Sequence, residues 1–327
     1  MVANGTPYTV GSLFAGVGGI CQAFKDASCD VVWANEVDEN SRRTYLANHP
    51  EVRFTSSHDV QDITKENTDP VDILTAGFPC QPFSQAGRAK GFDDPRGHLF
   101  YDVVRLMREL SPRAYLLENV KTLATHNNGE SFSVIAAEIE KAGYSFIPFI
   151  LRACEYTDIP QGRERIFIVG FRGEETFHYG APVRINDLKD LVGAPKSSSF
   201  TIPPPLGKDP RPVTDFLEPE TAEPSDFYGD QNSKIHLRVR DAVKKPGIVY
   251  QYRRWFVREN KSNVCPTLTA NMGLGGHNIP IVLAEPFPRR LSPKECWILQ
   301  CIQPHFQVPF LHLASLPARG RANPINN

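Results

Sequence analysis

The sequence predicts an α/β fold, in which a doubly wound, mostly parallel sheet is followed by a smaller, irregular domain. Two observations predict the sheet. A strand pattern at residues 8–14 leads through a glycine-rich turn into a helix, as in dinucleotide-binding folds, and residues 73–76 form a short continuous apolar run, which is typical of a strand buried on both faces. The smaller domain is predicted because residues 182–224 contain nine prolines and little periodic pattern.

The glycine-rich turn at residues 15–19 reads Ala-Gly-Val-Gly-Gly and precedes a helix predicted over residues 20–26. Glycines there allow a tight turn and a close approach of the backbone to a ligand. The next predicted strand, residues 30–35, is followed by Glu36, whose carboxylate is suited to bind the hydroxyl pair of a ribose. The pattern indicates a ligand that contains a nucleoside, and it fits NAD as well as other such cofactors.

Residues 57–60 read Ser-His-Asp-Val and are predicted to be a polar strand end. The carboxylate of Asp59 is suited to accept a hydrogen bond from the amino group of an adenine, while Val60 packs against the adenine ring.

Cys80 follows the apolar run at residues 73–76, after Gly77, Phe78 and Pro79. Ligand and catalytic groups of a parallel sheet gather at the carboxyl ends of its strands. An isolated cysteine is most often a small buried hydrophobe. The next apolar run, however, ends in Glu118 and places an acid at the same edge of the sheet. A nucleophile and an acid are therefore predicted to meet, which argues against NAD because hydride transfer needs no such nucleophile.

The remaining elements of the large domain are two amphipathic helices and a closing pair of strands. The helices are predicted over residues 98–110 and 131–141, and the strands over residues 149–154 and 165–170. Arg163 and Arg165 stand two residues apart before the last strand. On an extended segment they share one face, so both are able to reach one phosphate or carboxylate.

Three motifs, in this order and at this spacing, resemble the DNA (cytosine-5)-methyltransferase family. They are Phe78-Pro79-Cys80-Gln81, Glu118-Asn119-Val120 and Gln161-Gly162-Arg163-Glu164-Arg165. The resemblance covers residues 9–172 and resumes between residues 267 and 300. It implies a Rossmann-like methyltransferase of the bacterial restriction-modification type, which uses S-adenosyl-L-methionine to methylate carbon 5 of cytosine in a specific double-stranded DNA sequence.

The resemblance also implies roles for individual residues. Cys80 is the expected nucleophile toward a flipped-out cytosine, and Glu118 the expected acid. Arg165 is expected to hold the cytosine carbonyl, with Asn119 and Arg163 in support. The residues expected at the cofactor are Phe14, Gly16, Gly18, Gly19, Glu36, Asp59, Val60, Pro79 and Leu99.

A basic segment lies in the second domain, although the net charge of the whole chain is only −1. Residues 231–263 hold nine Lys or Arg against two acids, interleaved with four aromatic residues, which is typical of a surface that faces phosphates. The family resemblance adds the polar, glycine-rich segment at residues 85–97 as a second DNA contact. The DNA-binding candidates are Ser84, Arg88, Arg96, Arg253, Arg254, Arg258, Thr267 and Asn271.

The predicted domains are residues 1–172 for the cofactor and catalysis, residues 173–288 for target recognition, and residues 289–327 as a return to the large domain. Ser292 and Pro293 predict the start of a helix in this return segment. Beyond it the chain departs from the family, because residues 301–304 read Cys-Ile-Gln-Pro and no Gly-Asn turn follows. We therefore expect one wall of the cofactor pocket to be missing and the activity to be weak or absent.

The composition narrows the setting and the partners. No apolar run is long enough to cross a membrane, and no leader is recognisable at the N-terminus. Seven cysteines without paired spacing predict no metal site and a reducing compartment. We expect a monomer in the bacterial cytosol, associated with the nucleoid, with a cognate restriction endonuclease acting on the same site. Two alternatives stay open: a DNA-binding relative that has lost catalysis, and a tRNA cytosine methyltransferase.

Overall fold

The computed structural model describes residues 5–79, 99–173, 204–223, 226–229, 233–253, 255–260, 264–269, 272, 278–284 and 286–300. The chain divides into two compact units. Unit 1 runs to Tyr156 and continues with Glu164–Lys208, and unit 2 consists of Thr157–Arg163 together with the chain from Asp209 onward. A seven-residue piece of unit 2 is thus inserted between two parts of unit 1 in the sequence.

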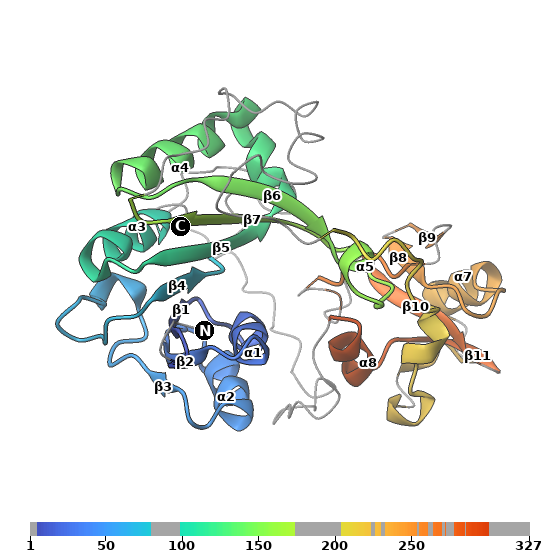
Figure 1. Ribbon diagram of the computed structural model, residues 1–327. Helices are drawn as coiled ribbons and strands as arrows, with labels where there is room; N and C mark the ends of the chain where they lie inside the picture. Colours follow the sequence, from blue (N-terminus) through green and yellow to red (C-terminus); the bar gives the residue numbers. More distant parts are fainter. Residues whose placement is uncertain are drawn as a thin grey trace, which may run out of the picture. The chain divides into compact units, whose positions relative to one another are not determined.

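Unit 1 is built on a seven-stranded sheet with the strand order β3-β2-β1-β4-β5-β7-β6 (Figure 1). The strands are β1 (Thr9–Leu13), β2 (Asp30–Ala34), β3 (Arg53–Phe54), β4 (Ile73–Ala76), β5 (Ala114–Val120), β6 (Ile147–Arg152) and β7 (Glu164–Phe171). The first five strands in this order are parallel, whereas β7 runs antiparallel to both β5 and β6. The predicted mostly parallel, doubly wound sheet is confirmed.

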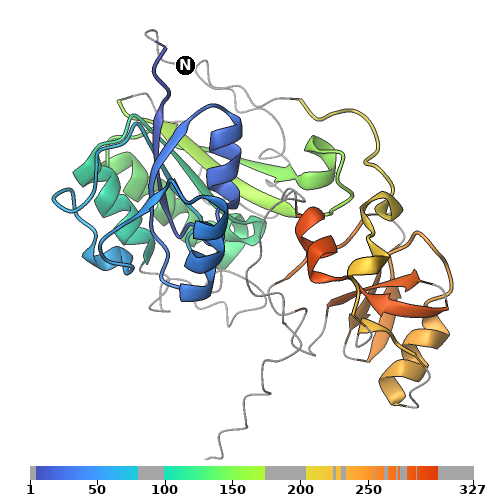
Figure 2. The ribbon, with the colours of Figure 1, turned by 90° about the horizontal axis from the view of Figure 1, so that it is seen from below.

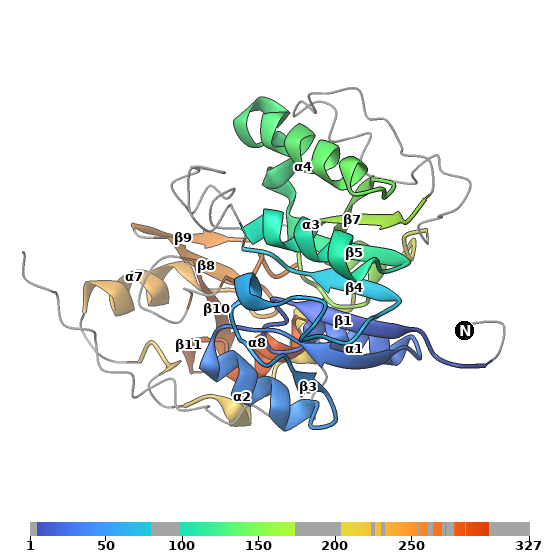
Figure 3. The same ribbon diagram turned by 90° about the vertical axis from the view of Figure 1, so that its left-hand side faces the viewer.

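Helices cover both faces of this sheet (Figures 1 and 3). The helices of unit 1 are α1 (Gly19–Asp26), α2 (Glu39–Asn48), η1 (Val60–Asp62), α3 (Leu99–Leu110), η5 (Lys121–Gly129), α4 (Glu130–Lys141) and α5 (Ala153–Tyr156). The larger core joins α3 and α4 to the sheet through side chains such as Met107, Ile135 and Leu74. A second core joins α1 and α2 to β1 and β2. Because neighbouring strand residues point to opposite faces, Ile73 packs against this second core and Leu74 belongs to the first.

Unit 2 contains a four-stranded antiparallel sheet with the order β11-β10-β8-β9. Its elements are η7 (Val213–Phe216), η8 (Pro219–Thr221), α7 (Lys234–Ala242), β8 (Tyr250–Arg253), β9 (Phe256–Glu259), β10 (Ile279–Ala284), β11 (Phe287–Arg290) and α8 (Pro293–Ile298). In Figure 2, α7 lies beside the orange strands of this sheet. The unit is more regular than the irregular domain that the sequence predicts.

Residues 289–300 belong to unit 2, and not to a segment that returns to the large domain as the sequence predicts for residues 289–327. The reason is that β11 pairs with β10, and that Arg289 forms a fully buried ion pair with Glu295 of α8, at 2.6 Å between Nη2 and Oε1. The predicted start of α8 is confirmed, since Ser292 caps the helix and Pro293 is its first residue. Residues 301–327, on which the expected missing wall depends, lie outside the described residues.

None of the helices in the described part of the chain is both long enough and apolar enough to cross a lipid bilayer. Within the same residues, no three His, Cys, Asp or Glu side chains gather as a metal ion would require.

Candidate active site

The glycine-rich turn after β1 has the conformation that its sequence predicts. Phe14, Gly16 and Gly18 all have positive φ angles, of 52°, 57° and 99°. Gly18 caps the N-terminus of α1, and the Ala15 amide donates to the carbonyl of Asn35 at the end of β2 (2.9 Å). A Cβ atom added to Gly16 or Gly19 would meet no heavy atom within 4 Å. The turn therefore borders open space, which a bound ligand is able to occupy.

Glu36 joins this turn to the second strand. Its Oε2 accepts a hydrogen bond from the Gly16 amide and its Oε1 one from the Asp38 amide, each at 2.9 Å. Asp38 in turn caps α2, because its carboxylate accepts from the Ser41 amide at 2.7 Å. A carboxylate oxygen accepts more than one hydrogen bond, so Glu36 keeps acceptor capacity for hydroxyl groups while it stays fixed in place.

Asp59 lies in a loop and not at the predicted strand end. Its side chain caps η1 and accepts a hydrogen bond from the Gln61 amide (3.0 Å), while its own amide donates to the Ser57 hydroxyl (3.2 Å). These side-chain acceptors bind the amides of Asp59 and Gln61 locally, so the segment forms a capped turn in place of a strand. Asp59 remains exposed, whereas Val60 is 3% exposed and belongs to the larger core.

Asn35 holds this loop and is absent from the sequence-based candidates. The side chain is 1% exposed, and its Nδ2 lies 3.0 Å from the Thr55 hydroxyl, 3.2 Å from the Ser57 carbonyl and 3.1 Å from the His58 carbonyl. The available signal was a polar amide at the end of an apolar strand, directly before Glu36. Asn35 fixes the path of the chain into Asp59.

The ends of β1, β4 and β5 meet around Gly77. A Cβ atom added there would lie 3.9 Å from both Glu118 Oε2 and the Phe14 carbonyl oxygen. Glu118 also forms an ion pair with Arg165, at 2.9 Å between Oε1 and Nε, and the two side chains are 23% and 17% exposed. The structure thus brings the predicted acid and the predicted arginine together, beside the chain that leads to Cys80.

Asn119 anchors the chain just before the predicted nucleophile. It is 2% exposed, and its Nδ2 donates to the Phe78 carbonyl at 3.1 Å while its Oδ1 accepts from the Val120 amide at 2.9 Å. Pro79 follows as a half-buried residue, and Leu99 begins α3 against the larger core. The amide of Asn119 fixes the backbone at Phe78, and its supporting role in the reaction stays a prediction.

The arginine motif is divided between the two units. In unit 2, the Gly162 amide donates to the Cys265 carbonyl at 2.7 Å, and the Gln161 side chain donates to the Leu299 carbonyl at 2.6 Å. Arg163 ends this segment of unit 2, and Arg165 lies on β7 in unit 1. Arg165 contacts the Glu118 carboxylate, and a shared ligand for the two arginines stays a prediction.

Some DNA-binding candidates lie on the hairpin of β8 and β9. Arg258 is exposed, and Arg253 donates to the Gln251 side chain at 3.1 Å. Trp255 and Phe256, between these arginines, are 79% and 57% exposed. Thr267 lies elsewhere in unit 2, where its hydroxyl donates to the Gly162 carbonyl at 3.2 Å. The candidates outside the described residues are Cys80, Ser84, Arg88, Arg96, Arg254 and Asn271.

The buried side chain of His49 packs against the glycine-rich turn at Gly18. A Cβ atom on Gly18 would come within 2.5 Å of His49 Nε2, so only glycine fits against this ring. Lys25 Nζ lies 2.9 Å from His49 Nδ1. Burial lowers the pKa of His49, and the positive charge of Lys25 lowers this pKa further. His49 is therefore favoured in its neutral form.

Comparisons with known proteins agree with this geometry. The family model described as C-5 cytosine-specific DNA methylase matches residues 8–322. The chain is 39% identical to the Type II methyltransferase M.Bsp6I of Bacillus sp. (strain RFL6), over 92% of this chain and 90% of the relative. It is 35% identical to the Type II methyltransferase M.NlaX of Neisseria lactamica, over 91% and 86% of the two chains.

Solved structures share the fold. The S. pombe Dnmt2 methyltransferase matches with a TM-score of 0.62 at 19% identity, over 92% of this chain and 88% of that chain. A mutant of Spodoptera frugiperda DNMT2 matches with a TM-score of 0.65 at 17% identity, over 92% and 91%. The family match over most of the chain, the close bacterial relatives and the arrangement of Glu36, Glu118 and Arg165 lead to one conclusion: the chain belongs to the C-5 cytosine-specific DNA methylases.

Proposed function

We propose that the chain transfers a methyl group from S-adenosyl-L-methionine to carbon 5 of a cytosine within a specific duplex DNA sequence, with Cys80 as the nucleophile. The observation that carries the proposal is the meeting of Glu118 and Arg165 beside Gly77, three residues before Cys80. The glycine-rich turn after β1 lies at the same edge of the sheet, because β1 is the parallel neighbour of β4.

The residues at this edge fit the cofactor. Gly16 and Gly19 border open space, Glu36 is fixed with spare acceptor capacity, and Asp59 presents an exposed carboxylate. Glu36 would bind the ribose and Asp59 the adenine amino group. Phe14 and Gly18 would line the cofactor site from within the glycine-rich turn. When bound, S-adenosyl-L-methionine supplies an electrophilic methyl group on its sulfonium.

The chemistry of the protein groups follows from the low reactivity of cytosine carbon 5. The Cys80 thiolate forms a bond to carbon 6, and Glu118 provides a proton at ring nitrogen 3, so that electron density moves to carbon 5. Carbon 5 takes the methyl group; loss of its proton then restores the double bond and expels the Cys80 thiolate. Because the target atom lies inside the base stack, the cytosine must first be flipped out, at a cost of a few kcal/mol.

Arg165 has two functions in this scheme. Its guanidinium holds Glu118 through Nε, and its remaining donors are suited to the cytosine carbonyl. Asn119 supports the segment that leads to Cys80 through the Phe78 carbonyl. Arg163 is proposed as a second support of the Cys80 loop.

Double-stranded DNA is the proposed partner of the β8–β9 hairpin. Arg253 and Arg258 supply positive charge for phosphates, and the exposed Trp255 and Phe256 supply flat apolar surface for bases. The bacterial relatives are named as Type II methyltransferases. On this basis we also propose a cognate restriction endonuclease for the same sequence, a monomeric state and a location in the bacterial cytosol.

The test uses wild-type protein and the Cys80→Ser variant with duplex DNA and S-adenosyl-L-methionine. Wild-type protein is expected to protect one sequence in bisulfite sequencing, at a low rate because of the expected missing wall of the cofactor pocket. Cys80→Ser is expected to lose this methylation while it binds the cofactor as the wild type does. A duplex with 5-fluorocytosine at the target should trap wild-type protein covalently, because fluorine cannot leave as the proton does. Methylation by Cys80→Ser at the wild-type rate would contradict the covalent route, and methylation of tRNA alone would replace DNA as the substrate.

A further inference from the structure

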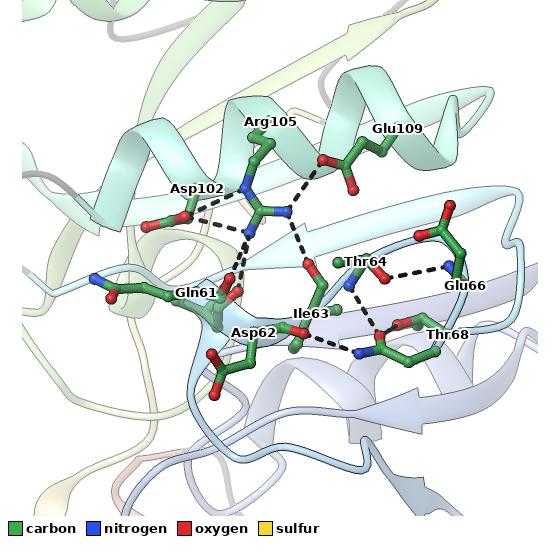
Figure 4. Close-up of polar contacts among 11 residues, drawn as sticks. Gln61, Asp62, Ile63, Thr64, Glu66, Thr68, Asp102, Arg105 and Glu109 are labelled. Carbon is green, nitrogen blue, oxygen red and sulfur yellow. Dashed lines mark hydrogen bonds and ion pairs between the residues drawn. The ribbon is translucent and has the colours of Figure 1, made fainter.

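Arg105 on α3 holds the turn that carries Asp59, although neither its position nor its neighbours mark it as a site residue in the sequence. Its Nη1 donates to the Ile63 carbonyl at 2.7 Å, and its Nη2 donates to the Val60 carbonyl at 3.1 Å and the Gln61 carbonyl at 3.4 Å (Figure 4). All three acceptors belong to the backbone in or next to η1, so this contact fixes the chain itself.

Two carboxylates of the same helix orient the guanidinium. Asp102 Oδ1 lies 3.4 Å from Nε and 3.2 Å from Nη2, and Glu109 Oε1 lies 3.2 Å from Nη1 (Figure 4). The guanidinium is planar and carries five donors in a fixed fork. A lysine ammonium has three donors at a single point, and it cannot reach three carbonyls and two carboxylates together.

The segment on both sides of Asp59 is thus held at two ends. Asn35 binds the carbonyls of Ser57 and His58 ahead of Asp59, and Arg105 binds the carbonyls that follow it. Between these anchors the Asp59 carboxylate stays exposed while it caps η1. A carboxylate recognises an amino group well only when its position is held to within about 0.5 Å, so the anchors determine how well Asp59 does so.

We infer that Arg105 is a positioning residue for adenine recognition, acting through the backbone of η1 on the carboxylate of Asp59. This inference rests on the proposed function, in which Asp59 accepts the amino group of the bound adenosine. It extends that function to a residue on another element, 45 residues from Val60 in the sequence.

The test separates adenine recognition from general damage. Isothermal titration of the full chain measures S-adenosylhomocysteine and S-inosylhomocysteine, which carries a carbonyl oxygen in place of the adenine amino group. Wild-type protein is expected to prefer the adenosyl compound by roughly tenfold or more, as a hydrogen bond to a charged group provides. In Arg105→Lys this preference should fall severalfold, and in an Asp59→Ala background Arg105→Lys should change it no further.

Arg108→Lys is the matched control, since Arg108 lies one turn along α3 and pairs only loosely with Glu138, at 3.4 Å. It should leave the preference unchanged. The double variant Asp102→Asn with Glu109→Gln keeps Arg105 but removes its supports, and it should lower the preference in the same direction. An equal loss of affinity for both ligands in Arg105→Lys would overturn the inference and leave the proposed function intact. Wild-type protein that binds neither ligand would overturn both.

Discussion

The buried ion pair between Arg289 and Glu295 makes a quantitative prediction about unit 2. Both side chains are fully buried, and two contacts join them, from Nη1 to Oε2 at 2.7 Å and from Nη2 to Oε1 at 2.6 Å. The Arg289→Met substitution removes one partner and leaves the Glu295 carboxylate buried without its counter-charge. Loss of one partner of a buried pair costs about 3–5 kcal/mol, because the remaining charge is desolvated without compensation.

The cost should fall on unit 2 alone, so the assay must resolve the two units. Native-state hydrogen exchange followed by mass spectrometry does this through peptides from β8 and β10 and peptides from β1 and β4. A loss of about 3 kcal/mol corresponds to roughly 150-fold faster exchange in the unit 2 peptides. The unit 1 peptides should exchange as in the wild type.

Two further variants test the reasoning. Glu295 also accepts hydrogen bonds from the amides of Ser292 and Glu218, at 2.7 and 2.8 Å. Arg289→Met combined with Glu295→Gln removes both charges and keeps an acceptor for one of these two amides, so it should recover part of the lost protection. Lys294→Met, on the exposed side of the same helix, should change little. If Arg289→Met lowers the stability of unit 2 by less than about 1 kcal/mol, the argument that an uncompensated Glu295 carboxylate destabilises this unit is wrong.

Three shorter predictions concern the site. The lowered pKa of His49 means that protonation of this side chain favours the unfolded chain. The contribution of neutral His49 to stability is therefore full above its unfolded pKa of about 6.5 and is lost as the pH falls through the lower folded pKa. Urea midpoints between pH 7.5 and 5 should fall more steeply for the wild type than for His49→Gln, and parallel curves would contradict this. Asn119→Ala removes the amide that donates to the Phe78 carbonyl, at a cost of about 1–3 kcal/mol. Stopped-flow methylation should slow while cofactor affinity is kept, and an unchanged rate would argue against the anchor. Trp255→Ala should weaken duplex binding in anisotropy titrations and spare cofactor affinity, and equal loss of both would point to misfolding.

The sequence predicted unit 1 well because its signals are local. The continuous apolar run at residues 73–76 and the glycines at 15–19 each determine a short segment, and the structure has β4 and the turn before α1 at these places. The start of α8 was equally local, since Ser292 and Pro293 lie within one helical turn of each other. The meeting of Glu118 with the end of β4 followed from the parallel pairing of β4 with β5.

What the sequence did not predict depends on contacts between distant residues. The strands of unit 2 are short, and β8 pairs not only with β9, its neighbour in the sequence, but also with β10, where Tyr250 lies opposite Ile281. Arg105 binds the Val60 carbonyl, 45 residues away in the sequence, and Asn35 binds the His58 carbonyl, 23 residues away. Neither role is visible in the local sequence. An arginine on an amphipathic helix is ordinarily a solvated residue, so nothing in its local pattern indicates that it holds a turn.

The division of the arginine motif has a consequence for protein engineering. Residues 157–163 belong to unit 2, yet they are encoded between β6 and β7 of unit 1. A recombinant that imports a foreign stretch from Asp209 onward therefore keeps the host version of this piece, with Gly162 and Gln161 hydrogen-bonded to Cys265 and Leu299. Specificity grafts between relatives should succeed when both segments are exchanged together or when both parents have glutamine at position 161, because the other three groups in these hydrogen bonds belong to the backbone.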